Sequence, residues 1–242
     1  MYCEEFSKHN FPIRNAYNPC FLYKRMEKQL KLSPSSLNVF LDCPRCFWNQ
    51  FNGKKRPSGI FPSLPNGIDN ILKHYFEHFR KKGIVPPEIE ELGAKMYVGP
   101  EMKDWQSNFR GIQWTDSKTG VMLRGAVDEM LIKEGKLIVL DFKTRGFPLK
   151  DDTHEHYRNQ LDTYNFLLKK NNRKVENYGY LLFYHPKQAC KGKKCYIEFN
   201  TDLVKMKANP SQAEKVFRDA VACLRGKEPK AKDGCEWCTY SQ

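Results

Sequence analysis

The sequence contains no long hydrophobic run. No stretch of its 242 residues approaches the roughly 18 consecutive apolar residues that a membrane-spanning helix needs, so we expect no membrane span. The N-terminal stretch MYCEEFSKHNFPIRN lacks the apolar core of a secretory signal, which predicts a cytoplasmic protein. Internal repeats and low-complexity tracts are also absent, which argues against solenoid and fibrous architectures.

Acidic residues are scarce relative to basic ones. The chain has 28 Asp and Glu against 41 Lys and Arg, which gives a formal net charge of +13. Such an excess favours an anionic partner, most commonly nucleic acid, although a merely basic protein is the plainer alternative. A chain of 242 residues suits one domain with elaborations. We expect residues 1–30 to form an N-terminal arm and residues 31–242 to form a single domain.

Cysteine, in contrast, is abundant. Nine cysteines are many for a cytosolic chain, and the number is odd. In a reducing compartment such residues are more often metal ligands or small buried hydrophobes than disulfide partners. Four of them form two C-x-x-C pairs, Cys43 with Cys46 and Cys235 with Cys238, separated by most of the chain. Each pair is a local ligand pattern, whereas reduced, unligated thiols are the alternative.

Residues 123–144 read as one β-hairpin. Two apolar, β-branched runs flank the turn signal Lys-Glu-Gly-Lys at 133–136. With a two-residue turn, Asp128 falls opposite Asp141 on one face, and Lys143 lies on that face two residues further along. Facing carboxylates repel each other, and a divalent cation such as Mg²⁺ between them would turn this repulsion into attraction. The alternative is a solvated hairpin whose outer face carries these charges.

Helices and further strands are expected around this hairpin. A helical segment at 33–51 is interrupted at Pro44, and a second helix covers 67–82. Later helices are expected at 154–170 and 211–224, and strands at 102–114, 175–184 and 193–199. In the first of these later helices, Gln160 and Tyr164 are four residues apart and therefore share a face.

Five short motifs occur in order along the chain. They are SPSSLNVFLDCPRCFW from residue 33, Gly-Ala-Val-Asp at 125–128, Asp-Phe-Lys-Thr at 141–144, Gln-Leu-Asp-Thr-Tyr at 160–164, and the terminal C-x-x-C-x-Y. Together they resemble the PD-(D/E)XK nuclease superfamily, specifically its RecB-like branch. The resemblance implies an α/β fold with a central mixed β-sheet flanked by helices, in a restriction-endonuclease-like core. It also implies metal-dependent hydrolysis of phosphodiester bonds.

The resemblance assigns roles to the residues of the hairpin. Asp128 and Asp141 would hold Mg²⁺ or Mn²⁺ together with the backbone carbonyl of Phe142. Lys143 would position the attacking water or stabilise the pentacovalent phosphorus. This chemistry is consistent with a metal that polarises the phosphate and generates hydroxide.

The helix motif extends this assignment, and an earlier helix departs from it. Gln160 and Tyr164 would line the site and hold DNA or the lysine. RecB-like members usually carry a metal-binding histidine four residues after a glycine of the early helix. Here Ile71 stands at that place, four residues after Gly67, and His74 lies one turn later. Either the metal has fewer protein ligands, or His74 substitutes.

The cysteines also depart from the family pattern. Iron–sulfur members of the branch use one early and three late cysteines, whereas this chain offers two early and two late ones. Four thiolates suit either a [4Fe–4S] cluster or a structural Zn²⁺. If the two pairs close into one centre, the C-terminus is clipped to the early helix. Cys223 is a fallback ligand.

We therefore expect a Mg²⁺-dependent deoxyribonuclease that acts in DNA repair, recombination or defence, with protein partners if it belongs to a larger complex. The alternative is a non-cleaving nucleic-acid-binding subunit on the same fold. A third hypothesis, a structural or redox protein centred on the cysteines, requires those cysteines to be the functional centre.

Overall fold

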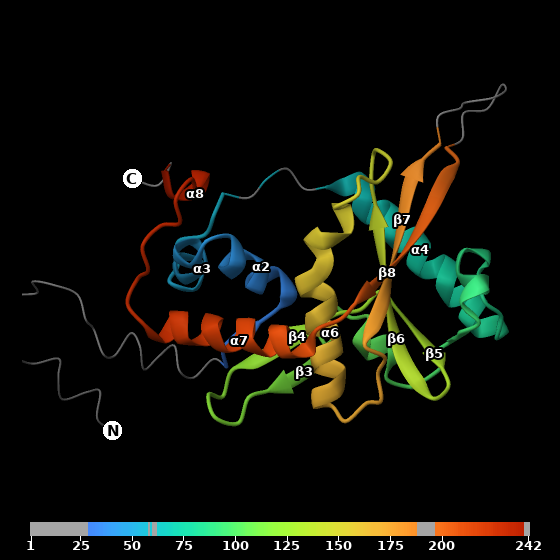
Figure 1. Ribbon diagram of the computed structural model, residues 1–242, viewed down its shortest axis with the longest axis horizontal. Coiled ribbons are helices and arrows are strands. Elements are labelled where there is room, and N and C mark those ends of the chain that lie inside the picture. Colours follow the sequence, from blue (N-terminus) through green and yellow to red (C-terminus); the bar gives the residue numbers. More distant parts are fainter. Residues whose placement is uncertain (1–28, 58, 60–61, 188–196, 240–242) are drawn as a thin grey trace, which may run out of the picture.

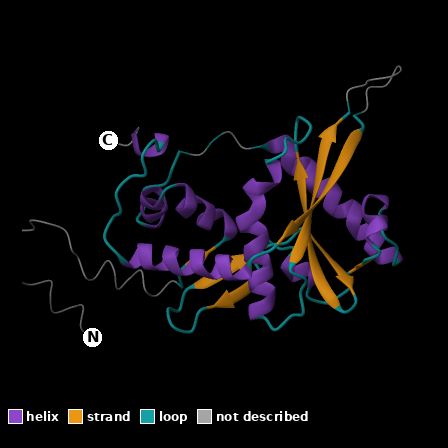
Figure 2. Cartoon of the chain, viewed as in Figure 1, coloured by secondary structure: helices purple, strands orange, loops and turns teal. Residues whose placement is uncertain are grey.

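The computed structural model describes residues 29–57, 59, 62–187 and 197–239. Within them, strands form two sheets, and helices pack around both sheets (Figures 1 and 2). The predicted α/β fold, a mixed sheet flanked by helices, is confirmed. The expected arm at residues 1–30 lies almost wholly outside the described residues. Among the described helices, none combines the length and the apolar character that crossing a membrane requires.

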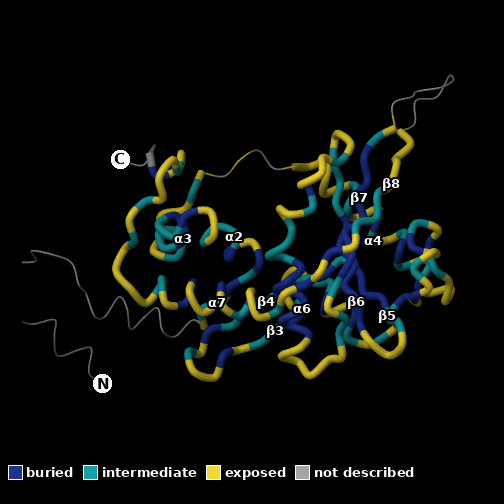
Figure 3. Tube along the Cα trace, in the orientation of Figure 1, coloured by how far each residue is buried: buried dark blue, intermediate teal, exposed yellow. Residues whose placement is uncertain are grey.

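The larger sheet has five strands in the order β2-β5-β6-β7-β8. Its strands are β2 (Lys95–Met96), β5 (Glu129–Lys133), β6 (Lys136–Thr144), β7 (Tyr178–Pro186) and β8 (Phe199–Lys207). Strands β6 and β7 are parallel and the other pairs are antiparallel, so the sheet is mixed. Strand β6 is central and is buried from Leu137 to Phe142, and most of its trace is dark in Figure 3.

Alternation along β6 divides its side chains between two helices. Val139 belongs to the same core cluster as Leu161 of α6 (Arg158–Lys170), while Ile138 and Leu140 belong to the cluster of α4 (Ser63–Lys82). The two helices lie on opposite faces of the sheet (Figure 1). Because both faces are covered, the strand is a nearly continuous apolar run. The polar residues near its end therefore interrupt this apolar run on the face of the sheet that α6 covers.

The smaller sheet has three strands in the order β1-β4-β3. These strands are β1 (Lys31–Leu32), β4 (Met122–Gly125) and β3 (Ile112–Thr115). Helices α2 (Pro34–Asp42), α3 (Pro44–Phe51) and α7 (Pro210–Arg225) pack together beside it (Figure 1). The shorter elements are α5 (Met102–Trp105), α8 (Glu236–Thr239) and two 3₁₀ helices, η2 (Pro87–Leu92) and η3 (Thr153–Tyr157).

Local chemistry explains where the first two helices begin. The side chain of Ser33 accepts a hydrogen bond from the backbone N–H of Ser36, whose own side chain accepts one from Ser33, forming a capping box. Pro34 and Pro44 open α2 and α3, where a missing N–H does no harm. The predicted interruption at Pro44 is confirmed, and Cys43 links the two helices.

Three predicted segments need correction. The hairpin comprises only residues 129–144, because residues 122–125 pair in the smaller sheet instead. The segment predicted as a strand at 102–114 begins with helix α5, and strand β3 starts only at Ile112. The last strand is Phe199–Lys207 rather than 193–199, of which residues 193–196 lie outside the described part of the chain.

Candidate active site and four-cysteine centre

The predicted register of the hairpin is confirmed. Lys133 pairs with Lys136 and Glu129 pairs with Leu140, and the turn residues Glu134 and Gly135 both have positive φ (50° and 74°), as a type I′ turn requires. Strand β5 starts at Glu129, so Asp128 lies one residue before it, beside the part of β6 that continues past Leu140. The paired residues end at Glu129 and Leu140, one position short of Asp128 and Asp141, so the two acidic residues follow directly on the confirmed register.

Asp128 is held by backbone contacts. Its carboxylate accepts a hydrogen bond from the backbone N–H of Phe142 at 3.0 Å, and its carbonyl accepts one from the Gln106 side chain at 2.6 Å. A β-carbon on Gly125 would lie only 2.7 Å from the Tyr164 ring. The Gly-x-x-Asp pattern thus has a steric cause, since the backbone passes directly against helix α6 before it reaches Asp128.

Asp141, Lys143, Gln160 and Tyr164 form one connected network. Lys143 forms an ion pair with Asp141 and donates to the Gln160 side-chain oxygen at 3.1 Å. The Gln160 amide nitrogen donates to Asp141 at 3.2 Å and lies 2.7 Å from the Tyr164 hydroxyl. The Lys143 ammonium also lies 4.6 Å from the centre of the Tyr157 ring. The structure brings all four residues together at the α6 side of the sheet.

This network is electrostatically unusual. Burial and the neighbouring Asp141 carboxylate raise the pKa of Asp128 well above the ordinary range of a carboxyl group. Burial alone would lower the pKa of Lys143. The Asp141 and Asp128 carboxylates have the larger effect and raise the pKa of this ammonium group. Burial and the same carboxylates raise the pKa of Tyr164, which remains a phenol. Keeping both Asp128 and Asp141 ionised therefore requires positive charge close to them.

Helix α4 supplies two residues that sequence reasoning missed. The Lys73 ammonium lies 2.7 Å from the Asp69 carboxylate and 3.5 Å from that of Asp128. Asp69 and Lys73 line an open pocket of about 440 Å³ together with Asp128 and Lys143. The four-residue spacing of Asp69 and Lys73 was a usable signal, because it puts both on one helix face.

The two positions considered for an early metal ligand do not face this pocket. Ile71 is 67% exposed, and His74 is exposed and is not among the described residues that line the pocket. The buried residues of α4 are Leu72, Phe76 and Arg80, and together they set the rotation of this helix. Arg80 forms an ion pair with the fully buried Glu129 next to Asp128. At this rotation the helix presents Lys73 to the site rather than His74.

The four predicted cysteines also come together. The sulfur of Cys43 lies 3.7 Å from that of Cys238, and the sulfur of Cys46 lies 3.6 Å from Cys235 and 3.5 Å from Cys238. All four sulfurs lie within 4.8 Å of one another, and we call them the four-cysteine centre. Cys223 lies outside it, with its sulfur 3.8 Å from the Pro44 carbonyl.

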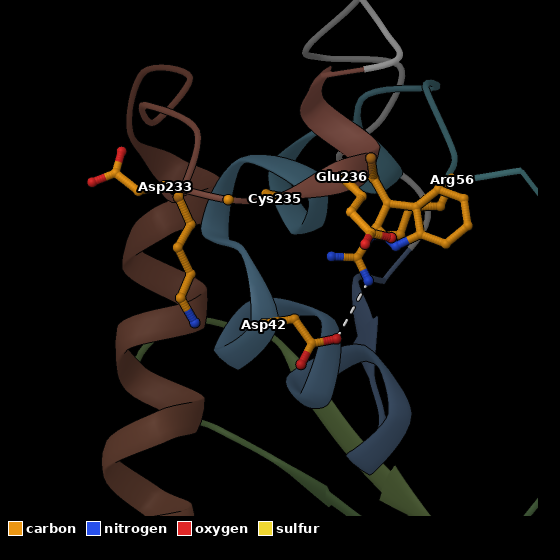
Figure 4. A pocket seen from close by; sticks show the side chains of 8 residues that line it. Asp42, Arg56, Asp233, Cys235 and Glu236 are labelled. Carbon is orange, nitrogen blue, oxygen red and sulfur yellow. Dashed lines mark hydrogen bonds and ion pairs between the residues drawn. The ribbon is translucent and has the colours of Figure 1, made fainter.

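A second pocket, of about 260 Å³, lies against this centre (Figure 4). Arg56 forms an ion pair with Asp42 at 3.3 Å, and its guanidinium lies 5.7 Å from the centre of the Trp237 ring. Cys235 and Glu236 enter the same pocket from the C-terminal segment. The loop at residues 54–57 is therefore tied to both chain segments that supply cysteines.

Comparison with known proteins gives one family match. The model of the PD-(D/E)XK nuclease superfamily matches residues 62–242. No curated protein matches the sequence. The crystal structure of SSO0001 is a similar solved structure, with 14% identity and a TM-score of 0.41, and the alignment covers 92% of this chain and 93% of that one.

Proposed function

This chain belongs to the PD-(D/E)XK nuclease superfamily, and on that premise we propose that it is a metal-dependent deoxyribonuclease of the RecB-like branch. The observation that carries the proposal is a connected set of polar side chains at one open pocket. Asp128, Lys143, Gln160 and Tyr164 line this pocket. The buried Asp141 lies behind them and contacts Lys143 and Gln160. DNA repair, recombination or defence is the proposed setting, within the cytoplasm and with protein partners where the chain acts in a larger complex.

The residues of the site fit a divalent cation. The Asp141 carboxylate is buried, the Asp128 carboxylate beside it is half-buried, and Asp141 raises the pKa of Asp128. Carboxylate oxygens of this kind suit Mg²⁺ or Mn²⁺. We assign Asp128, Asp141 and the Phe142 carbonyl as the ligands. The bound ion would polarise the phosphate and lower the pKa of a coordinated water.

Side chains of the protein would then stabilise and position the reacting phosphate. The Lys143 ammonium would stabilise the negative charge that develops on the phosphate oxygens during the reaction. Gln160 fixes that ammonium through its side-chain oxygen and fixes Asp141 through its amide nitrogen, so neither group needs to reorganise during reaction. Arg124 lines the same pocket and offers a positive charge to the DNA backbone.

A cleavage assay tests this proposal. Purified protein should cut labelled single- or double-stranded DNA with Mg²⁺ or Mn²⁺, and Asp141→Asn and Lys143→Ala should each lower the rate at least about 100-fold. Lys136→Ala is the matched control, because Lys136 lies at the exposed start of the same strand and pairs with Glu176 at 3.1 Å. Equal trace activity in wild type and both variants would contradict the assignment of Asp141 and Lys143 as catalytic residues. Faster cleavage of RNA than of DNA would contradict the assignment of DNA as the substrate.

One observation favours a second candidate, a non-cleaving nucleic-acid-binding subunit. The Lys73 ammonium lies 3.5 Å from Asp128, so it competes with a metal at one proposed ligand. This candidate predicts DNA binding that weakens steeply with salt and no metal-dependent cleavage. The assay above, combined with a binding titration at two salt concentrations, separates the two functions.

We also propose that residues 31–242 act as one domain in which the four-cysteine centre clips the C-terminal segment to the early helices. The nearness of the four sulfurs supports this clip, and a [4Fe–4S] cluster and a structural Zn²⁺ are the two candidates to occupy it.

A further inference from the structure

The spacing of the four sulfur atoms separates these two candidates. A tetrahedral Zn²⁺ binds each thiolate at about 2.3 Å, so the edges of its sulfur tetrahedron are about 3.8 Å long. Three of the sulfur–sulfur distances are 3.5, 3.6 and 3.7 Å, and no pair in the four-cysteine centre exceeds 4.8 Å. The sulfurs are too far apart for disulfides, whose bond length is about 2.05 Å.

A [4Fe–4S] cluster does not fit this spacing. Each thiolate of such a cluster binds a different iron at a separate corner of the cube, so the sulfurs stand roughly 6 Å or more apart. A [2Fe–2S] cluster also requires this larger separation between the two sulfur pairs. The centre is too compact for either cluster, whereas a single ion fits at its middle.

The surroundings are those of a metal–thiolate site. The Cys43 sulfur accepts hydrogen bonds from the backbone N–H groups of Cys46 and Lys232. The Arg56 guanidinium contacts the Cys46 sulfur and is held in place by Asp42 and Trp237. Such outer hydrogen bonds and positive charge stabilise thiolate ligands and offset the net negative charge of a four-thiolate zinc complex.

We infer that the four-cysteine centre binds one Zn²⁺ ion in a closed tetrahedral site. Binding displaces the thiol protons and forms four Zn–S bonds without oxidation or reduction. Four protein ligands leave no open position, so the ion is structural rather than catalytic. It joins the C-terminal segment to the junction of α2 and α3, independently of whether the chain cleaves DNA.

Metal analysis of the full-length protein tests this inference. The protein is purified without oxygen and without added metal, and its metal content and visible spectrum are measured. We expect about one zinc per chain, no stoichiometric iron and no absorbance band near 400 nm. About four irons per chain with such a band would overturn the inference, and so would a chain that contains neither metal.

Cysteine variants identify the ligands. Cys235→Ser should lose most of the zinc, whereas Cys223→Ser should retain it, because Cys223 is a neighbouring cysteine outside the centre. A chain with serine at the four cysteines outside the described residues should also retain it; these are Cys3, Cys20, Cys190 and Cys195. Equal loss in Cys223→Ser and Cys235→Ser, or loss in the fourfold variant, would refute the ligand set. The wild-type metal content keeps the test decisive if Cys235→Ser fails to fold.

Discussion

At the scale of single residues, Lys73 and Asp69 are expected to control metal affinity. A divalent cation bound at Asp128 would repel the Lys73 ammonium, which lies 3.5 Å from that carboxylate and 2.7 Å from Asp69. Removing the ammonium should therefore favour the metal. We expect Lys73→Met to bind Mn²⁺ about tenfold more tightly, a change of about 1.4 kcal/mol, in a calorimetric titration.

Two further variants sharpen this prediction. Asp69→Asn removes the other partner of Lys73, so the ammonium should remain on Asp128 and Mn²⁺ should bind more weakly than to wild type. Lys81→Met is the control, because Lys81 lies on the same helix with a 73% exposed side chain. If Lys73→Met bound Mn²⁺ no more tightly than Lys81→Met, Lys73 would not compete with the metal.

The glycine that precedes Asp128 offers a test of packing. A methyl group at position 125 would approach the Tyr164 ring to 2.7 Å and Leu167 to 3.2 Å. Gly125→Ala should therefore lower the free energy of unfolding by about 1–3 kcal/mol, the usual range for overpacking, measured by urea denaturation. Gly146→Ala should change it little, because a β-carbon there meets nothing within 4 Å. Equal stabilities of the two variants would count against the steric role.

The sequence predicted those site residues that follow from local rules. Strand alternation and a two-residue turn placed Asp128, Asp141 and Lys143 together, and helical spacing placed Gln160 with Tyr164. The spacing of Asp69 and Lys73 puts both on one helix face, but it does not show that this face meets Asp128. The rotation of α4 depends in part on the buried Arg80–Glu129 ion pair, which joins residues far apart in the chain. No local pattern encodes that contact.

At the scale of elements, one carboxylate joins α6 to α7. Asp162 of α6 is 2% exposed and accepts a hydrogen bond at 2.6 Å from the backbone N–H of Asn209, the N-cap residue of α7. Burial raises the pKa of Asp162 from 3.8 to about 6, although the Asn209 N–H and Arg158 act in the opposite direction. The contact between these helices is therefore sensitive to pH.

The sign of this pH dependence follows from linkage. Because the pKa is raised in the folded state, Asp162 contributes its full stability below pH 3.8 and loses it as the pH rises through about 6. Asp162→Asn keeps an oxygen acceptor for Asn209 but has no charge to bury. The free energy of unfolding of wild type minus that of Asp162→Asn should fall by about 3 kcal/mol between roughly pH 4 and 7. A difference independent of pH would contradict this account.

Strand boundaries show where element prediction failed. Strand β8 is paired with β7 over nine residue pairs, yet most of its side chains are exposed or only half-buried. Such an edge strand lacks the regular apolar alternation that marks a strand in sequence. Similarly, residues 122–125 leave the predicted hairpin because they pair with β1 and β3. Both errors arise because partners distant in sequence determine the pairing.

At the scale of the whole molecule, helix α2 connects the two sites. Residues 33–35, at its N-terminal end, line the candidate active-site pocket, while Cys43, which follows its last residue, belongs to the four-cysteine centre. The C-terminal segment reaches the same region through an ion pair at 2.6 Å between Arg45 and Glu228, and through the Trp48 side chain, which donates to the Gly226 carbonyl at 3.2 Å. The proposed zinc ion would therefore fix one end of a helix whose other end borders the candidate active-site pocket.

Removing the zinc should consequently loosen this half of the molecule selectively. A zinc-selective chelator, applied without Mg²⁺, should lower the free energy of unfolding by at least about 3 kcal/mol and the Tm by roughly 6–12 °C. Amide hydrogen exchange should accelerate in α2, α3 and residues 226–239, but not in α4 or β6, which pack in the larger sheet. The chelator should have no effect on a Cys43→Ser chain. Uniform acceleration across both sheets would mean that the ion supports the whole fold, whereas unchanged exchange in α2 would mean that the two sites are independent.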